Sequence, residues 1–326
     1  MTPVELSRTV LRAVRRAVDE GELAVTVPER AVVALPGPGG CGDYSTNIAL
    51  RLARPAGQPA QRVAEILRPH LVEQDGVGDV VVTGPGFINI SLSGTADPVA
   101  SLVREIRERG TAYGHGDALA GQVVALRVPY EARAEVVADA LVRIVAAQGG
   151  RAETGHGEPV NLRPVPAPED PAPLGPDAAR WALLHPAAHD RPRITADHLV
   201  QREGNPLFRV RYAHARTRAL SRNAARLGFD AVPGEVEGAE VRELVAALAD
   251  HPRVIAASAV HRAPDRLARH LVTVADAALP FLPTVLPYGE EKPSAAHRSR
   301  LALAEAAGTV LAGGLSLLGI DAPDHL

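Results

Sequence analysis

The sequence Asn-Pro-Leu-Phe-Arg-Val-Arg-Tyr-Ala-His-Ala-Arg, residues 205–216, begins the stretch that decides the fold of this chain. Asn205 suits the N-cap position of a helix, and Pro206 suits its first turn. Apolar residues then recur at helical spacing, while six arginines fall between Arg209 and Arg226 without an acid among them. The pattern predicts a long helix with one face that packs and another that carries positive charge.

One side of this predicted helix, which we expect to end near Leu227, carries four of the arginines: Arg211, Arg218, Arg222 and Arg226. At the helical turn angle, Arg211, Arg218 and Arg222 lie within about 40° of one another. A run of like charge is often no more than a solvated helix face, and that interpretation stays open. The stretch holds no acid to pair the arginines, and the whole chain carries a net charge of −3. The stripe therefore favours a phosphate-rich partner.

The composition is that of a folded chain. With 326 residues, 46% of them hydrophobic, it is long enough for roughly two or three domains. No apolar run reaches the roughly 18 residues of a membrane span, and the first residues lack an apolar signal core. We therefore expect a cytoplasmic protein without a membrane partner. Cys41 is the only cysteine, which excludes disulfide frameworks and thiolate zinc sites.

The first hundred residues predict a small α+β domain. Helices are expected at residues 2–19, 47–53 and 59–71, and strands at 31–35, 80–83 and 86–90. Phe87 lies in the last of these strands, in the apolar sequence Gly-Phe-Ile-Asn-Ile, and is expected in the core.

The glycine-rich segment Gly37-Pro-Gly-Gly-Cys-Gly42 formally matches the G-x-G-x-x-G pattern of dinucleotide-binding loops. That fingerprint requires a second parallel strand with an acid at its end, about 20 residues further on. A helix follows here instead, and the next expected strand begins only at Val80. We therefore predict a loop that leads into a capped helix, and no nucleotide cofactor.

The middle of the chain alternates short elements before a helical end. A helix is expected at 99–109, a buried strand at 123–128, a helix at 133–148 and a second strand near Val160. Five prolines within residues 164–173 predict an extended or irregular linker rather than a packed element. Beyond the linker, apolar spacing predicts helices at 205–227, 241–248, 253–260, 264–281 and 299–317, which is typical of an α-helical bundle. The predicted fold class is α+β.

His185 and His189 stand four residues apart, a spacing that two metal ligands on one helix can use. Pro186 lies between them at the end of a predicted helix, and the pattern supplies no further ligand. We therefore expect no metal site here. Trp181 is at helical spacing with its apolar neighbours and is expected in the core.

Several stretches resemble one family. Asn205-Pro206, followed by Tyr-Ala-His-Ala-Arg at 212–216, is similar to the signature of the anticodon-binding, DALR-type domain of arginyl-tRNA synthetases. Residues 42–50 and 84–90 are similar to the N-terminal additional domain of that family, which contacts the tRNA elbow. The sequences at 174–184 and 314–323 resemble the beginning and the end of the anticodon-binding domain. The resemblance covers about residues 1–145 and 174–326.

The resemblance implies two groups of tRNA-binding residues. On the anticodon side they are Arg209, Arg211, Tyr212, His214, Arg216, Arg218 and Arg222, and on the elbow side Tyr44 and Asn47. The arginines would contact backbone phosphates, and Tyr44 would stack on an unpaired base. Packing is the favoured role for His214. For Tyr44 and Asn47, packing and helix capping stay open as alternatives.

The catalytic site of such a synthetase is not recognisable in this sequence. In the family, a strand like that at 123–128 leads into a histidine motif that binds the ATP phosphates; here it ends at Pro129 and a helix follows. No histidine lies between Val123 and Arg151, and the only lysine, Lys292, is far from the place of the family's mobile phosphate-binding loop. Because adenylate chemistry needs fixed cationic groups at the phosphates, we predict no catalytic residue and no aminoacylation.

These observations predict three parts. They are an elbow-binding-like domain at 1–116, a remnant of the catalytic domain with its linker at 117–173, and a helical anticodon-binding domain at 174–326. The implied function is binding of tRNA, with arginine tRNA as the expected partner, by a non-catalytic paralogue of the synthetases. Two alternatives stay open: a protein–protein module that associates with a synthetase or a tRNA-dependent enzyme, and a residual ligase subunit that binds ATP.

Overall fold

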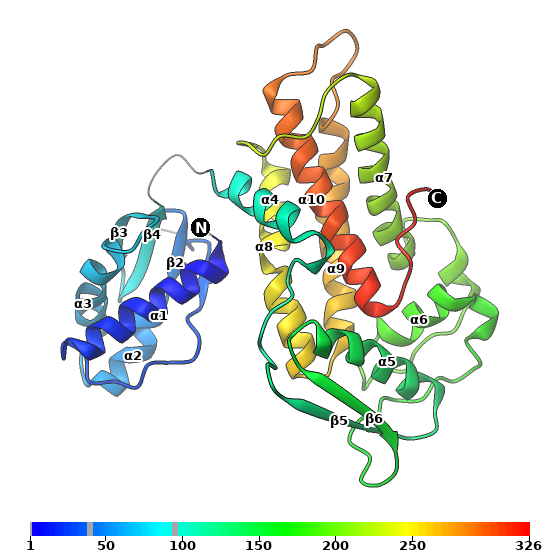
Figure 1. Ribbon diagram of the computed structural model, residues 1–326, viewed down its shortest axis with the longest axis horizontal. Coiled ribbons are helices and arrows are strands. Elements are labelled where there is room, and N and C mark those ends of the chain that lie inside the picture. The colour runs from blue at the N-terminus through cyan, green and yellow to red at the C-terminus, as the bar shows by residue number, and fades with distance from the viewer. Residues whose placement is uncertain (1, 38–41, 93–96) are drawn as a thin grey trace. The chain divides into compact units, whose positions relative to one another are not determined.

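The computed structural model describes residues 2–37, 42–92 and 97–326 (Figure 1). The chain divides into two compact units, Met1–Ser101 and Leu102–Leu326. The fold is mixed α+β with a helical C-terminal part, which confirms the predicted fold class. The domain boundaries placed at residues 116 and 173 stay a prediction.

The first unit packs three helices against a four-stranded antiparallel sheet (Figure 1). Its helices are α1 (Pro3–Asp19), α2 (Ile48–Ala56) and α3 (Ala60–Val72), and its strands are β1 (Val33–Ala34), β2 (Tyr44–Thr46), β3 (Val77–Thr83) and β4 (Phe87–Leu92). The strand order is β1-β2-β4-β3. One core joins these elements, from Leu6 and Val10 on α1 to Ile88 and Ile90 on β4.

Local signals in the sequence explain how α1 begins. The Thr2 hydroxyl accepts a hydrogen bond from the Glu5 backbone N–H (3.3 Å), and the Glu5 carboxylate accepts one from the Thr2 backbone N–H (2.8 Å). This capping box satisfies two donors that a helix start would otherwise leave open, and Pro3 fits the first turn. Leu6 and Val14 then lie on the buried face, as the apolar spacing predicts.

Two glycines allow close approach in the first unit. Gly42 has φ +78°, and a Cβ at this position would lie 2.9 Å from the carbonyl oxygen of Ile90. Gly86 has φ +125°, and a Cβ there would lie 2.8 Å from the carbonyl carbon of Ala60. Both positions therefore require glycine, because an L side chain would be strained and would clash.

Two expectations for this unit meet different outcomes. Residues 38–41, which form most of the glycine-rich segment and include Cys41, lie outside the described residues, so the loop predicted there is not tested. Phe87 is 41% exposed, so its predicted place in the core is wrong. It is the first residue of β4, directly after a turn, and the next residue, Ile88, takes the buried face of the strand.

The second unit is a bundle of long helices with a small sheet (Figure 1). Its helices are α4 (Pro98–Arg109), α5 (Ala132–Ala146), α6 (Pro176–Leu184), α7 (Pro206–Arg226), α8 (Ala239–Val260), α9 (Pro264–Phe281) and α10 (Ala295–Leu318). Short 3-10 helices lie at Gly110–Ala112, Ala172–Leu174, Ala196–Leu199 and Leu282–Thr284. Strands β5 (Val123–Val128) and β6 (Arg151–His156) pair in parallel, with α5 as the crossover between them.

Two elements of this unit differ from the sequence expectation. The second strand lies at residues 151–156 and not near Val160, because its polar sequence Arg-Ala-Glu-Thr-Gly-His gives no apolar strand signal and most of it is exposed. The two helices expected at 241–248 and 253–260 are a single helix, α8, which continues through Pro252. An interior proline costs a helix about 3 kcal/mol, and the long packing of α8 against α9 offsets that cost.

Helix α10 lies along α7 and α9 (Figure 1). Gly308 and Gly314 make this packing possible, because a Cβ at either would clash with the side chain of Thr217 or Leu271. Among the described helices, α10 is the one that is long and apolar enough, by length and composition, to cross a membrane. It is mostly buried inside the unit, as the core helix of a bundle is.

Helix α5 is joined to the bundle by polar contacts. Asp139 forms an ion pair with Arg180 of α6, at 2.5 Å. The Nε of Arg143 donates a hydrogen bond to the carbonyl oxygen of Leu317 on α10, at 3.0 Å. The strand–helix–strand segment is therefore an integral part of the helical unit.

Candidate nucleic-acid interface

Helix α7 begins where the sequence predicts, and one side chain fixes that start. The side-chain oxygen of Asn205 accepts hydrogen bonds from the backbone N–H of Leu207 (3.1 Å) and Phe208 (3.4 Å). Its amide nitrogen donates to the carbonyl oxygens of His198 (2.9 Å) and Val200 (3.0 Å). Asn205 therefore caps the helix and also holds the preceding turn against it.

The arginines of α7 are half-buried or exposed, yet three of them have acidic partners. Arg209 contacts Asp276 of α9 (3.1 Å), Arg211 contacts Asp177 of α6, and Arg218 contacts Asp324 (3.0 Å). The expectation that no acid pairs these arginines is therefore wrong. The stretch itself holds no acid, but the fold brings Asp177 from 34 residues away and Asp324 from 106 residues away.

The last six residues, Asp321–Leu326, pass along this side of α7 (Figure 1). Arg211 Nε donates to the Asp321 carbonyl oxygen (3.1 Å), Arg222 donates to the Asp324 carbonyl oxygen (3.3 Å), and His214 Nδ1 lies 3.1 Å from the Pro323 carbonyl oxygen. The hydrogen bond from Arg218 lowers the pKa of Asp324. A phosphate that approaches α7 must compete with groups that these arginines already hold.

The remaining residues predicted on the anticodon side differ in access. Tyr212 is 38% exposed and stacks on Phe208, with ring centroids 5.5 Å apart. Arg216 is exposed, and its side chain makes no ion pair or hydrogen bond within the part of the chain that the structure describes. His214 is buried, and burial lowers its pKa, so this side chain is placed for packing.

The residues predicted on the elbow side, Tyr44 and Asn47, lie in the first unit. Tyr44 packs against the core of that unit, and burial raises the pKa of its hydroxyl. Asn47 occupies the N-cap position of α2, yet its side chain makes no capping bond. The Oδ1 of Asn47 is buried and has no hydrogen-bond partner among the described residues. A buried acceptor without a donor is costly, so this oxygen needs a donor that the described residues do not supply.

Arg133 of α5 is a buried residue whose role sequence reasoning missed; it is 1% exposed. Its guanidinium donates five hydrogen bonds of 2.7–3.0 Å, to the carbonyl oxygens of Val165, Leu183, Pro186, Ala187 and Asp190. All five of its N–H donors are used. These carbonyls end α6, shape the segment that follows, and anchor the proline-rich linker. Only its place on the packed side of a predicted helix could have drawn attention to Arg133.

A basic cavity of about 340 Å³ adjoins the segment that Arg133 holds. Its charged and titratable lining consists of His185, Asp190, Arg191, Arg193, His198 and Arg269. His185 stacks on the buried Trp181, with ring centroids 5.1 Å apart, and burial lowers its pKa to about 4. His189, in contrast, is 85% exposed.

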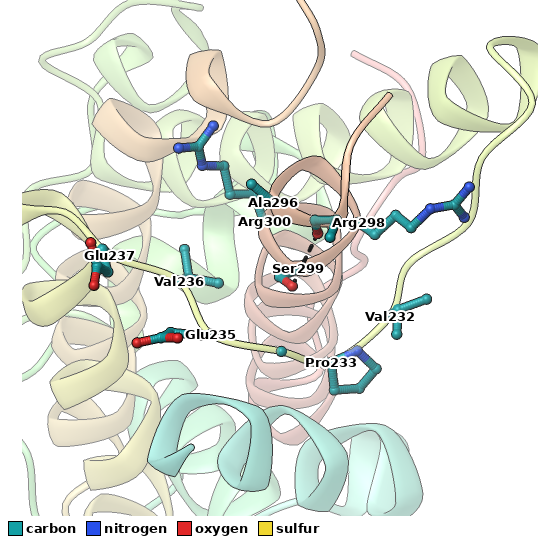
Figure 2. A pocket seen from close by; sticks show the side chains of 11 residues that line it. Val232, Pro233, Glu235, Val236, Glu237, Ala296, Arg298, Ser299 and Arg300 are labelled. Carbon is teal, nitrogen blue, oxygen red and sulfur yellow. Dashed lines mark hydrogen bonds between the residues drawn. The ribbon is translucent and has the colours of Figure 1, made fainter. Parts of the chain in front are cut away.

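A larger cavity, of about 560 Å³, lies between residues 232–237 and the first turns of α10 (Figure 2). Glu235 and Glu237 line it from the loop, and Arg298 and Arg300 line it from the helix. Arg298 and Arg300 already donate to backbone carbonyls, and Arg298 also lies over the Phe229 ring. With charge of both signs, this cavity indicates no single class of ligand.

One grouping in the first unit has the residue types of a metal site. Ligand atoms of Glu20, Glu22 and His70 lie within 4.8 Å of one another. The Nε2 of His70 is 2.6 Å from Glu22, while Glu20 is held by Arg16 at 2.7 Å. Contacts within the chain account for this arrangement. Sequence reasoning had considered only His185 and His189, because Glu22 and His70 are far apart along the chain.

Two models of known protein families match this chain. Residues 5–92 match the arginyl tRNA synthetase N terminal domain, and residues 210–326 match the DALR anticodon binding domain. Each compact unit therefore contains a match to one of these two domain models.

Similar curated proteins are arginine–tRNA ligases. That of Frankia alni is 37% identical over 159 residues, which is 46% of this chain and 28% of the ligase. That of Renibacterium salmoninarum is 43% identical over 127 residues, 38% of this chain and 23% of the ligase. That of Paenarthrobacter aurescens is 39% identical over 160 residues, 47% of this chain and 29% of the ligase. The chain thus spans less than a third of the length of these relatives.

Solved structures with a similar fold come from the same family. The arginyl-tRNA synthetase of Thermus thermophilus aligns with a TM-score of 0.69 at 15% identity, over 100% of both chains. The arginyl-tRNA synthetase of Plasmodium falciparum aligns with a TM-score of 0.65 at 9% identity, over 99% of both chains. At this level of identity the likeness is one of fold.

Proposed function

We propose that this chain binds tRNA through its two family domains and does not aminoacylate it. The DALR domain holds the anticodon arm, the N-terminal domain holds the elbow, and arginine tRNA is the expected partner in the cytoplasm. The observation that carries the proposal lies between the two matched segments. In the described part of that region, the only sheet consists of β5 and β6, and the helix between these strands, α5, is bonded into the bundle.

The chemistry of this middle region supports the second half of the proposal. Activation of an amino acid requires cationic groups fixed around the α-phosphate of ATP. Strand β5 ends at Val128, and Glu131 caps α5 directly afterwards by accepting from the Ala134 backbone N–H at 2.9 Å. Arg133, buried beside this turn, has all five donors occupied by carbonyl oxygens. These contacts suit a structural role rather than a nucleotide site.

The contacts on α7 indicate how RNA would be held. Arg216 is free to meet a phosphate, and a phosphate could take the place of the Asp324 carboxylate at Arg218. The exposed ring of Tyr212 offers a surface on which an unpaired base can stack. In the first unit, Tyr44 and Asn47 are the residues proposed to meet the tRNA elbow, as the resemblance of residues 42–50 implies.

Binding of total tRNA to the intact chain, measured across a salt series, tests the first half. We expect retention at low salt that weakens steeply as salt rises, because phosphate contacts release counterions. Arg216→Glu with Arg222→Glu should remove most of the binding. The matched control is Arg242→Glu, since Arg242 is exposed on α8, and it should bind as the unmodified chain does. A folded protein that retains no tRNA at low salt would contradict the proposal and leave the protein-partner hypothesis in front.

Arginine-dependent exchange of pyrophosphate into ATP tests the second half. We expect no exchange above the background without protein, with or without added tRNA. Exchange that the purified chain catalyses, and that depends on arginine, would show a working adenylate site and overturn the non-catalytic assignment.

A further inference from the structure

The segment between α6 and α7 forms a second basic surface of the helical unit, apart from the arginine side of α7. Its cavity of about 340 Å³ is bounded by the end of α6, residues 185–193, His198 and Arg269 of α9. That volume lies within the range of small-molecule sites, near the lower end.

Two of the three arginines that line this cavity have no polar partner among the described residues. Arg191 and Arg193 are exposed, and their side chains form no ion pair or hydrogen bond with the residues that the structure describes. Arg269 forms an ion pair with Asp265. The lining contains one carboxylate, that of Asp190. The lining therefore carries a net positive charge that nothing in the described fold neutralises.

The backbone around the cavity is held in place. Arg133 donates hydrogen bonds to the carbonyl oxygens of Leu183, Pro186, Ala187 and Asp190, and these bonds fix the backbone of the cavity wall. The Nε2 of His198 lies 2.9 Å from the Arg193 carbonyl oxygen, and this contact holds two residues of the segment between α6 and α7 together. A site whose backbone is fixed in advance pays less ordering entropy when a ligand binds.

The remaining wall supplies groups that suit an organic part of a ligand. Ala182, Pro186 and Ala187 are apolar, and His185 stands beside them, stacked on Trp181. Because burial lowers the pKa of His185, its imidazole is neutral at physiological pH and can donate or accept a hydrogen bond.

From the cavity, its two unpaired arginines and its fixed backbone, we propose that this site binds a phosphate group attached to an organic moiety of about nucleotide size. Arg191 and Arg193 hold the phosphate oxygens, while the wall of Ala182, Pro186 and Ala187 contacts the attached group. The phosphate belongs either to a free nucleotide or to an RNA strand, since both present the same chemistry. The proposal stands independently of the tRNA-binding function, because free nucleotides test it without RNA.

Calorimetric titration of the intact chain at low ionic strength tests the proposal. The probes are AMP, adenosine, which lacks the phosphate, and total tRNA. We expect AMP to bind and adenosine not to bind, and Arg191→Ala with Arg193→Ala to weaken AMP at least about tenfold, because charge-assisted hydrogen bonds are lost. Arg242→Ala, which removes an exposed arginine of α8, is the matched control and should leave AMP binding unchanged.

The two phosphate sources give different outcomes. Loss of AMP binding in the double variant with tRNA affinity unchanged assigns the site to a free nucleotide. Loss of tRNA affinity in a chain that never binds AMP assigns it to an RNA strand. If neither AMP nor tRNA binding differs between the double variant and the unmodified chain, the proposal is overturned. Both arginines are exposed, so the double variant is expected to fold.

Discussion

Two groups of arginines in the helical unit differ in what they contact. On α7, Arg209, Arg211 and Arg218 each face an aspartate brought from another part of the chain. In the segment after α6, Arg191 and Arg193 are exposed and have no partner in the described part of the structure. A stripe of arginines on a helix therefore does not show that these side chains are unpaired. The fold decides which arginines pair with an acid and which stay available to a ligand.

The largest effect should come from the residue that builds the second surface. Arg133→Met removes a buried guanidinium and leaves five carbonyl oxygens without their donor. We expect the free energy of unfolding to fall by about 3–5 kcal/mol, as when one partner of a buried charged network is removed. Urea denaturation measures this loss. Arg151→Met, at a side chain that is 75% exposed, is the control and should change little. A loss below 1 kcal/mol for Arg133→Met would mean that the segment does not depend on it.

Buried histidines of the same unit should make its stability depend on pH. His251 and His270 stack on each other, and each has a buried ring nitrogen without a partner among the described residues. Burial lowers the pKa of His270 from 6.5 to about 4; Asp250 raises this pKa and Arg253 lowers it. Burial also lowers the pKa of His251, and the nearby His115 lowers it further.

A folded-state pKa below the unfolded one means that the unfolded chain binds more protons. The stability is therefore complete above pH 6.5 and is lost as the pH falls toward 4, by up to about 3 kcal/mol for His270. Urea denaturation at several pH values measures the slope, and the difference between the unmodified chain and His270→Phe isolates it from the carboxylates. Equal slopes in the two proteins would contradict the assignment.

A smaller effect tests whether the acids on α7 limit its charge. Asp324→Asn removes the carboxylate that Arg218 holds, so we expect tRNA to bind roughly two- to fivefold more tightly, because an exposed ion pair competes only weakly with a phosphate. Asp250→Asn, which breaks the exposed pair with Arg253, is the matched control and should not change binding. Affinity that stays the same in both variants would show that the C-terminal segment does not compete with RNA.

The smallest effect should be that on the unfolding free energy when the arginines of the second basic surface are replaced. Arg191→Ala and Arg193→Ala remove exposed side chains that form no ion pair or hydrogen bond with the described residues, so the unfolding free energy should change by less than about 0.5 kcal/mol. Thermal denaturation checks this. A larger loss would mean that these arginines take part in the fold and would remove the contrast with α7.

The sequence predicts well what depends on near neighbours. The start of α7 follows from Asn205 and Pro206, and α1 follows from a capping signal and apolar spacing. Motifs of a few residues also carried the resemblance to the synthetase domains that the family matches confirm. Local signals decide these features, because capping and amphipathic spacing act within one or two turns.

What the sequence did not predict depends on contacts between distant residues. Asp324 reaches Arg218 across 106 residues, and Arg133 finds its carbonyl partners 32 to 57 residues later. The sequence did not predict strand β6, because this strand pairs on one side only and carries few apolar residues. The gap expected between residues 248 and 253 is absent, because the packing of α8 against α9 offsets the local cost of Pro252.

The most direct test of the central claim is the identity of the RNA that the intact chain retains from a total RNA pool at moderate salt. The account predicts that the bound fraction is enriched in tRNA over other RNA of similar length, with arginine acceptors foremost, because two separate domains read the elbow and the anticodon arm. A bound fraction with the composition of the input pool would mean that the chain attracts phosphate without recognising tRNA. That result would contradict the account.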